Sequence, residues 1–252
     1  GATRRFPEEI TQELAQIKAL VGERPFGVDL VLPPGMPEHD SREAIEIDIP
    51  DGHKAFVQSI IEQYSIPPAT QPGMRTRFIR SAEIEAAQIQ SVLASPVNMF
   101  ACGIGAPAAV IEAAKAQGMT TLALIGSPHH VARTIAAGVD IIVAQGYDAG
   151  AHTGTIGTYS LVPQIVEAAG DVPVLVAGGV ATGKHIAAAL AMGAQGVWMG
   201  TAWLFSEEHQ GHMHPINTQK LIEAGSGDTV ITRSESGKTF RQVRSGWSQA
   251  WE

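Results

Sequence analysis

Short runs of apolar residues alternate with helix-like segments over residues 97–201, and this alternation constrains the fold more than any other feature of the chain. The strand-like runs are apolar at nearly every position rather than at every second one. That pattern indicates parallel strands covered on both faces. With one earlier run, six strands are predicted, over residues 26–31, 97–102, 120–125, 140–144, 173–177 and 196–199.

The spacing of these strands favours an α/β fold of the (β/α)8 TIM barrel type, because strand–helix units recur every roughly 20–30 residues without a long break. An open doubly wound sheet is the alternative. Six strands are too few to close such a barrel. We therefore expect a first βα unit and most of a second strand to lie upstream of this numbering, with Gly1-Ala2 as the end of that strand.

Residues 1–252 are interpreted as a single barrel domain with an insertion at about 33–80. Helices are predicted over 7–21, 53–64 and 81–93, and the stretch around the second of them is polar and proline-flanked. Long insertions in compact domains are often lids or binding loops, so we expect a lid-like role for this one.

The composition narrows the class of partner. Lys and Arg number 17 against 25 Asp and Glu, which gives a net charge of −8, and no basic cluster is present. This balance argues against nucleic acid or an anionic membrane and leaves a small-molecule substrate. Cys102 is the single cysteine, and no long apolar run or signal peptide is seen, so we expect a cytoplasmic location. The oligomeric state stays open, with a homodimer as the first arrangement to test.

The stretch 144–154, AQGYDAGAHTG, directly follows a predicted strand and holds the first candidate for chemistry. Its glycines allow close approach of the backbone to a ligand. His152 is a candidate proton-transfer group, since the ordinary pKa of histidine lies near neutrality. Asp148 either orients that imidazole or caps the turn.

Two further glycine-bearing strand ends predict a phosphate site. VAGGV at 176–180 and WMGT at 198–201 follow consecutive strands, and the last two βα loops of a barrel commonly bind phosphate. No GxGxxG or GxxxxGK[ST] motif indicates a dinucleotide fold or a P-loop. His209, His212 and His214 lack an acid or cysteine at firm spacing, so no metal site is predicted.

These motifs carry a resemblance to a known family. AQGYDAGAHTG, LVPQIVEA at 161–168 and PVLVAGGVATGKHIAAALAMGAQGVWMGT at 173–201 resemble the nitronate monooxygenase (2-nitropropane dioxygenase) family, as do PFGVDL at 25–30 and the ending TVITRS…SGK…R…W. The resemblance implies a TIM barrel that binds FMN. The related flavin-dependent enoyl-ACP reductases share the glycine motifs.

The resemblance also implies roles for individual residues. His152 would be the catalytic base that removes the α-proton of a nitroalkane, whose nitronate is then oxidised with dioxygen through FMN. Asp29 stands where many members carry Asn, and Ala151 replaces the first residue of a usual Gly-His pair. The residues expected to bind the cofactor are Asp29, Gln145, Gly146, Gly150, Gly178, Gly179, Trp198, Met199, Gly200 and Thr201.

The alternative function is a flavin-dependent reductase of an enoyl-type CoA or ACP thioester, with NAD(P)H as a further partner. The shared motifs do not separate it from nitronate oxidation. A non-redox phosphosugar aldolase or isomerase is a third class. It would require a Schiff-base lysine or paired carboxylates at the strand ends, and neither is seen.

Overall fold

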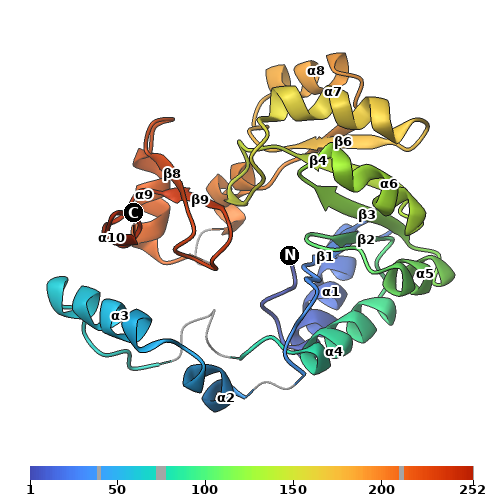
Figure 1. Ribbon diagram of the computed structural model, residues 1–252. Coiled ribbons are helices and arrows are strands. Elements are labelled where there is room, and N and C mark those ends of the chain that lie inside the picture. Colours follow the sequence, from blue (N-terminus) through green and yellow to red (C-terminus); the bar gives the residue numbers. More distant parts are fainter. Residues whose placement is uncertain (39–40, 72–77, 210–212, 252) are drawn as a thin grey trace.

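The computed structural model describes residues 1–38, 41–71, 78–209 and 213–251, and all six predicted strands form one parallel sheet. The sheet curves round on itself, with the helices on its outer side (Figure 1). Its strands are β1 (Gly27–Leu30), β2 (Met99–Cys102), β3 (Thr120–Ile125), β4 (Ile141–Gln145), β6 (Val174–Ala177) and β7 (Gly196–Trp198).

The strand order separates the two predicted architectures. Within the sheet the order is β1-β2-β3-β4-β6-β7, so each new strand adds to the same edge as the chain proceeds. A doubly wound sheet reverses its direction at a switch point, and this sheet does not. The α/β barrel-type fold is therefore confirmed, with six strands forming an open part of the barrel.

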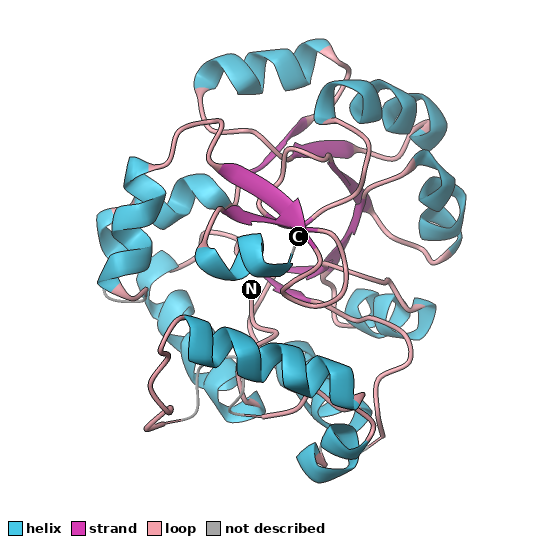
Figure 2. Cartoon of the chain, turned by 60° about the vertical axis from the view of Figure 1, so that its left-hand side comes forward, coloured by secondary structure: helices cyan, strands magenta, loops and turns pink. Residues whose placement is uncertain are grey.

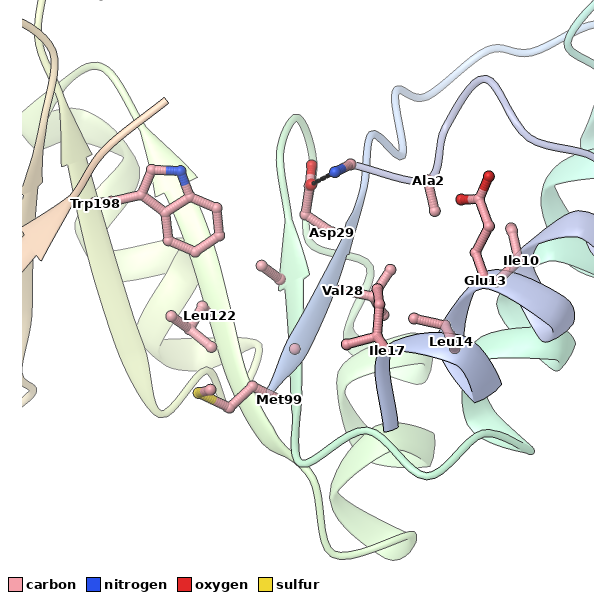
Figure 3. A pocket seen from close by; sticks show the side chains of 13 residues that line it. Ala2, Ile10, Glu13, Leu14, Ile17, Val28, Asp29, Met99, Leu122 and Trp198 are labelled. Atoms are coloured by element: carbon pink, nitrogen blue, oxygen red, sulfur yellow. Dashed lines mark ion pairs between the residues drawn. The ribbon is translucent and has the colours of Figure 1, made fainter. Parts of the chain in front are cut away.

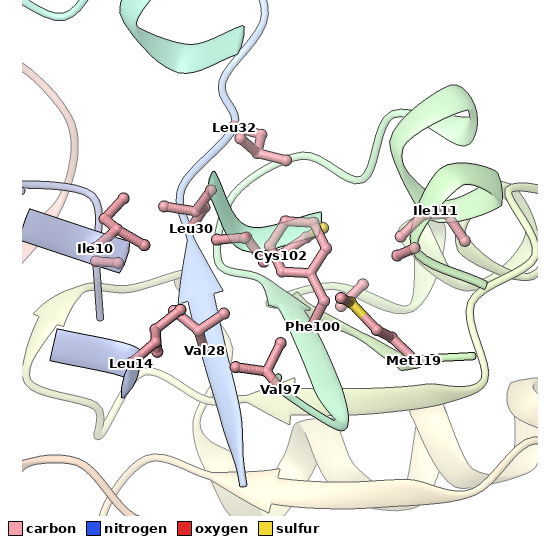
Figure 4. Close-up of a cluster of buried hydrophobic side chains, with 14 of the residues drawn as sticks. Ile10, Leu14, Val28, Leu30, Leu32, Val97, Phe100, Cys102, Ile111 and Met119 are labelled. Atoms are coloured by element: carbon pink, nitrogen blue, oxygen red, sulfur yellow. The ribbon is translucent and has the colours of Figure 1, made fainter. Parts of the chain in front are cut away.

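Helices cover the outer face of the sheet and bury its core (Figure 2). One hydrophobic cluster lies around the fully buried Phe100, with Leu30 and Ile111 beside it (Figure 4). A second cluster lies around Ile142, Leu161 and other residues. The covering helices are α1 (Pro7–Val21), α4 (Ala82–Leu93), α5 (Ala108–Ala116), α6 (Val131–Ala136), α7 (Thr158–Ala169) and α8 (Gly183–Ala191), and the 3-10 turn η1 (Pro128–His130) precedes α6.

The insertion contains α2 (Arg42–Ile47), which was not predicted, and α3 (Asp51–Gln63), which matches the predicted helix at 53–64. Both lie away from the sheet in Figure 1. On α3, the ring of Phe56 packs against Trp247 at 6.3 Å and against Trp251 at 5.4 Å between centroids. The insertion therefore contacts the C-terminal segment, and its role as a lid stays a prediction.

The C-terminal segment adds elements that the alternation did not predict. A small antiparallel sheet has the order β5-β9-β8, in which β5 is only two residues long. Such short, polar strands carry no apolar run to reveal them. β5 (Ala151–His152) lies in the loop after β4. The C-terminal segment, residues 201–251, contains η2 (Thr201–Phe205), η3 (Glu207–His209), α9 (Pro215–Glu223), β8 (Thr229–Thr232), β9 (Phe240–Val243) and α10 (Gly246–Trp251).

The structure also bears on two smaller points from the sequence, the start of the chain and its apolar runs. Gly1-Ala2 forms no strand, although the N–H of Ala2 donates to the carbonyl oxygen of Asp29 at 2.9 Å, alongside β1. One hydrogen bond of this kind does not make the ladder that defines a strand. Among the described residues, no helix is both long and apolar enough to span a membrane.

Asp140 joins β3, β4 and α5 at the N-terminal end of the sheet. Its carboxylate accepts hydrogen bonds from the backbone N–H and the hydroxyl of Thr121, both at 2.8 Å, and from Lys115 at 2.7 Å. Burial opposes ionisation here, but the hydrogen bonds from Lys115 and Thr121 outweigh it and lower the pKa of Asp140. The carboxylate is therefore more stable ionised in the folded state than in the unfolded chain.

Replacing Asp140 tests this junction. Asp140→Asn is expected to lower the free energy of unfolding at pH 7 by about 1–2 kcal/mol, because it weakens charge-assisted hydrogen bonds at a partly exposed site. The lowered pKa means that the stabilisation is complete above the ordinary aspartate pKa and disappears as the pH falls through the folded value. Urea unfolding at pH 7 and at about pH 3 measures both effects. The role of Asp140 would be contradicted if the exposed control Asp171→Asn lost as much free energy of unfolding at pH 7. It would also be contradicted if Asp140→Asn stayed less stable than the wild type in acid.

Candidate active site

The backbone leaves β4 at Gln145 and folds back on itself before it reaches His152. The amide of Gln145 donates from Nε2 to the carbonyl oxygen of His152 at 2.6 Å. The hydroxyl of Thr153 donates to the carbonyl oxygen of Gly146 at 3.0 Å. These two hydrogen bonds close the predicted glycine-rich stretch into a compact loop at the C-terminal end of the sheet.

His152 is held in place by the C-terminal segment. It pairs with Phe240 across β5 and β9, and the two rings meet edge to face at 5.1 Å between centroids. The imidazole Nε2 lies 2.6 Å from Oγ of Ser236. Sequence reasoning missed Ser236 and Phe240, although both fall within the ending, TVITRS…SGK…R…W, that carried the family resemblance. The ring orientation of His152 is thus set by residues about 85 positions away.

Asp148 acts as a cap, but the group that it caps is the N-terminus of α7, whereas the sequence predicted a cap of its own turn. Its Oδ2 accepts the backbone N–H of Thr158, the first residue of α7, at 2.9 Å. Burial opposes ionisation of this carboxylate, but the hydrogen bonds from Thr158 and the nearby Arg241 lower its pKa. A charged carboxylate at a helix N-terminus is favourable because it meets unpaired N–H groups there.

The predicted glycines come together where three loops meet. A Cβ at Gly146 would lie 2.6 Å from the backbone nitrogen of Thr158, and one at Gly150 would lie 2.7 Å from Oγ1 of Thr201. Gly178 and Gly179 have φ of +96° and +76°, a region that favours glycine. Close packing and positive φ therefore require several of these glycines whether or not a ligand binds.

A few of the predicted residues line a cavity, and these are split between two separate cavities. The larger, of about 1260 Å³, is lined by Gln145 and His152 together with the loops that follow β1, β2 and β3. The smaller, of about 320 Å³, lies inside the curve of the sheet and is lined by Asp29 and Trp198 (Figure 3). Asp29 forms an ion pair with the amino group of Gly1 at 3.1 Å. The other predicted cofactor residues lie on the loops after β4, β6 and β7 and line neither cavity.

Cys102 and His214 have places in the core and in a helix cap. Cys102 is buried at the end of β2, and burial together with the charge of Asp29 raises the pKa of its thiol to about 12. It therefore stays protonated at neutral pH. His214 caps α9 through Nδ1, and His212 lies outside the described residues. Within the described part of the chain, no three His, Cys, Asp or Glu side chains gather in a way that could hold a metal ion.

Comparison with known proteins decides the family. The family model described as nitronate monooxygenase matches residues 1–252. The chain belongs to the nitronate monooxygenase family. This is a family of flavin-dependent oxidoreductases, so the prediction of an oxidoreductase is confirmed.

Individual relatives agree with this membership. Rv1533 of Mycobacterium tuberculosis, which carries the name of a monooxygenase, is 39% identical over 262 residues, covering 100% of this chain and 69% of that protein. A Staphylococcus haemolyticus protein named as a nitronate monooxygenase is 32% identical, covering 96% of this chain and 67% of that protein. The chain thus spans about two thirds of the length of these family relatives.

Solved structures extend the comparison. The nitroalkane oxidase of Streptomyces ansochromogenes matches with a TM-score of 0.78 and 27% identity, covering 99% of this chain and 70% of that one. A mutant of FabK from Thermotoga maritima matches with a TM-score of 0.72 and 22% identity, covering 100% of this chain and 66% of that one. At that identity the FabK likeness shows the fold alone.

Gly146 offers a direct test of the junction between the loops. Gly146→Ala is expected to lower the free energy of unfolding by about 2–3 kcal/mol, because the new methyl group overlaps the backbone of Thr158, which cannot move aside cheaply. Thermal or urea unfolding measures the loss. The control Gly183→Ala adds a methyl group at the start of α8, where nothing lies within 4 Å, and is expected to be neutral or stabilising. Equal stability of the two variants would refute the tight junction.

Proposed function

We propose that the chain forms the FMN site and the base of an oxidoreductase that converts nitroalkanes and their nitronates with dioxygen. The observation that supports this most is the position of His152. It lines the large cavity at the C-terminal ends of the strands, and Ser236 and Phe240 hold its ring. Active sites of barrel enzymes lie at this end of the sheet.

The residues present fit a flavin. The cavity is large enough for a ring system with a substrate beside it, since ordinary ligand pockets measure roughly 300–1000 Å³. Gly178 and Gly179, after β6, both have positive φ, and they carry no side chains that would keep a phosphate away from the backbone. At Gly200, after β7, the space that a Cβ would occupy is open. These loops would hold the FMN phosphate, together with Trp198, Met199 and Thr201.

The remaining proposed contacts concern the ring. Of the residues expected beside the isoalloxazine, Gln145 lines the large cavity, and Gly146 and Gly150 follow it in the same loop. Asp29 lines the smaller cavity, so its contact would require the ring to reach beyond the large cavity. When bound, FMN supplies the redox step, passing electrons from the substrate to dioxygen. The protein contributes the position of the substrate and the electrostatics around it.

His152 would perform the proton transfer. It takes the proton from the α-carbon of a neutral nitroalkane, and the electron pair of the broken C–H bond stays on the substrate as the nitronate. Ser236 keeps the imidazole aligned through Nε2, and the hydrogen bond from Gln145 fixes the backbone of the same residue. A base is effective only when such contacts hold it within reach of the proton.

Replacing His152 tests this role. His152→Asn is expected to reduce turnover of a neutral nitroalkane by roughly 10²–10⁴-fold, while FMN stays bound, because only the proton acceptor is lost. Steady-state oxygen consumption measures turnover, and the visible absorption of the flavin measures cofactor content. Turnover of a preformed nitronate is expected to fall much less, since it has no α-proton to lose. Equal losses for both substrates would show that His152 is not the base.

The reductase alternative is separated by anaerobic reduction of the flavin. Under the proposed function, a nitronate bleaches the flavin in the absence of oxygen. Bleaching by NADPH with no response to a nitronate would overturn nitronate oxidation in favour of the reductase. A protein that purifies without any flavin and does not take up FMN would contradict both.

A further inference from the structure

One face of α3 packs against the start of α10. Phe56, Ile60 and Tyr64 recur four residues apart, so they lie on the same side of the helix. The ring of Phe56 packs against the indole of Trp247 at 6.3 Å between centroids, and Ile60 is buried. The hydroxyl of Tyr64 donates to the carbonyl oxygen of Gly246 at 3.4 Å. A Cβ at Gly246 would lie 2.9 Å from the Tyr64 ring, so the two elements meet closely at this point.

The indole of Trp247 makes a second contact with its polar edge. Its Nε1–H donates to the carbonyl oxygen of Ser234 at 3.4 Å. The half-buried ring therefore meets α3 with its apolar surface and the loop between β8 and β9 with its single hydrogen-bond donor. Phenylalanine has the aromatic surface without the donor, so a change to phenylalanine separates the two contacts.

Ser234 and Ser236 belong to one short turn between β8 and β9. The N–H of Gly237 donates to the carbonyl oxygen of Arg233 at 2.9 Å, which closes the turn around both serines. The amide of Gln242, on β9, donates from Nε2 to Oγ of Ser234 at 2.8 Å. We refer to residues 233–237 as the serine turn. Because the turn is short and closed by a hydrogen bond, a displacement of Ser234 is expected to displace Ser236 as well.

The serine turn reaches the candidate base. Oγ of Ser236 lies 2.6 Å from Nε2 of His152. Ser236 is itself exposed, so its position depends on the turn rather than on side chains packed around it. A continuous series of contacts therefore runs from α3 through Trp247 and the serine turn to the imidazole.

We propose that Trp247 is a positioning residue, which holds the serine turn against His152 and is itself supported by α3. This assignment rests on the proposed function, in which His152 removes the α-proton. It adds a side chain of the C-terminal segment and a helix of the insertion to the groups that govern that step. A base acts only when it is held within reach of the proton. A misplacement of about 1 Å costs roughly 10²-fold in rate, so a small shift of the serine turn is enough to slow proton transfer.

Trp247→Phe tests the hydrogen bond to the serine turn. The variant keeps an aromatic ring beside Phe56 and removes the donor to Ser234. It is expected to lower kcat for a neutral nitroalkane by roughly threefold to tenfold with little change in KM, because the base is less well placed while the substrate still binds. Turnover of a preformed nitronate is expected to stay near the wild-type rate, since it has no α-proton to lose. Oxygen consumption by the flavin-loaded protein measures both.

Two further variants test the route from α3 to the base. Ser236→Ala removes the contact with the imidazole, so in its background Trp247→Phe is expected to cause no further loss. Phe56→Ala withdraws the support of α3 from Trp247 and is expected to slow the neutral nitroalkane selectively. The matched control Val57→Ala, at an exposed position of the same helix, is expected to change neither substrate.

Four outcomes would overturn the proposal. The first is a wild-type rate in Trp247→Phe, and the second is an equal loss for both substrates in that variant, which indicates a general structural role. The third is a further loss when Trp247→Phe is added to Ser236→Ala. The fourth is a loss in Val57→Ala that matches the loss in Phe56→Ala.

NMR signals of the His152 ring separate this proposal from the function on which it rests. Spectra of the flavin-loaded protein with labelled histidine show which ring nitrogen carries the proton, and His152→Asn assigns the signals. Trp247→Phe is expected to shift them in the same direction as Ser236→Ala, but by less. If they shift while the wild type oxidises neither nitroalkane nor nitronate, the proposed reaction fails and the positioning role stands. If the wild type oxidises the nitroalkane and the signals of Trp247→Phe match those of the wild type, only the positioning role fails.

Discussion

The close contact between the loops after β4 and β6 is the constraint on which the candidate site depends. The N–H of Gly146 donates to the carbonyl oxygen of Ala177 at 3.0 Å, and the hydroxyl of Thr158 donates to the carbonyl oxygen of Gly178 at 3.0 Å. A side chain at Gly146 would occupy the place of Thr158. Backbone meets backbone at this point, so the chain is turned sharply as it leaves the sheet. The turn directs the next residues towards the C-terminal segment, where His152 pairs with Phe240.

The same turn constrains Ala151, the residue directly before His152. Ala151 has φ of +66°, a conformation that costs a non-glycine residue roughly 1–2 kcal/mol. Pairing with Arg241 holds it there, and Arg241 also donates to the carbonyl oxygen of Tyr147 at 3.0 Å. A glycine at this position would adopt the conformation without strain. Ala151 therefore holds this conformation next to His152 at an energetic cost.

The predictable and unpredictable parts of the site differ in the range of the forces that create them. The six strands and the glycines at their ends follow from local patterns, since a doubly covered strand is apolar throughout and a tight turn needs glycine. The cap role of Asp148 was one of two predicted roles, because the sequence does not show which N–H lies within reach. Ser236 and Phe240 could not be assigned, since their contact with His152 bridges more than 80 positions.

By itself the sequence determined the class of fold, the order of the strands along the chain and the family, and it singled out His152 as the candidate base. These properties reside in short-range periodicity and in motifs whose residues are close in the chain. The tertiary structure alone decided which residues orient that histidine, that Asp29 and Trp198 line a separate cavity, and how far the large cavity extends. Those properties depend on distances between segments remote in sequence, and such distances exist only once the sheet has curved and the loops have packed.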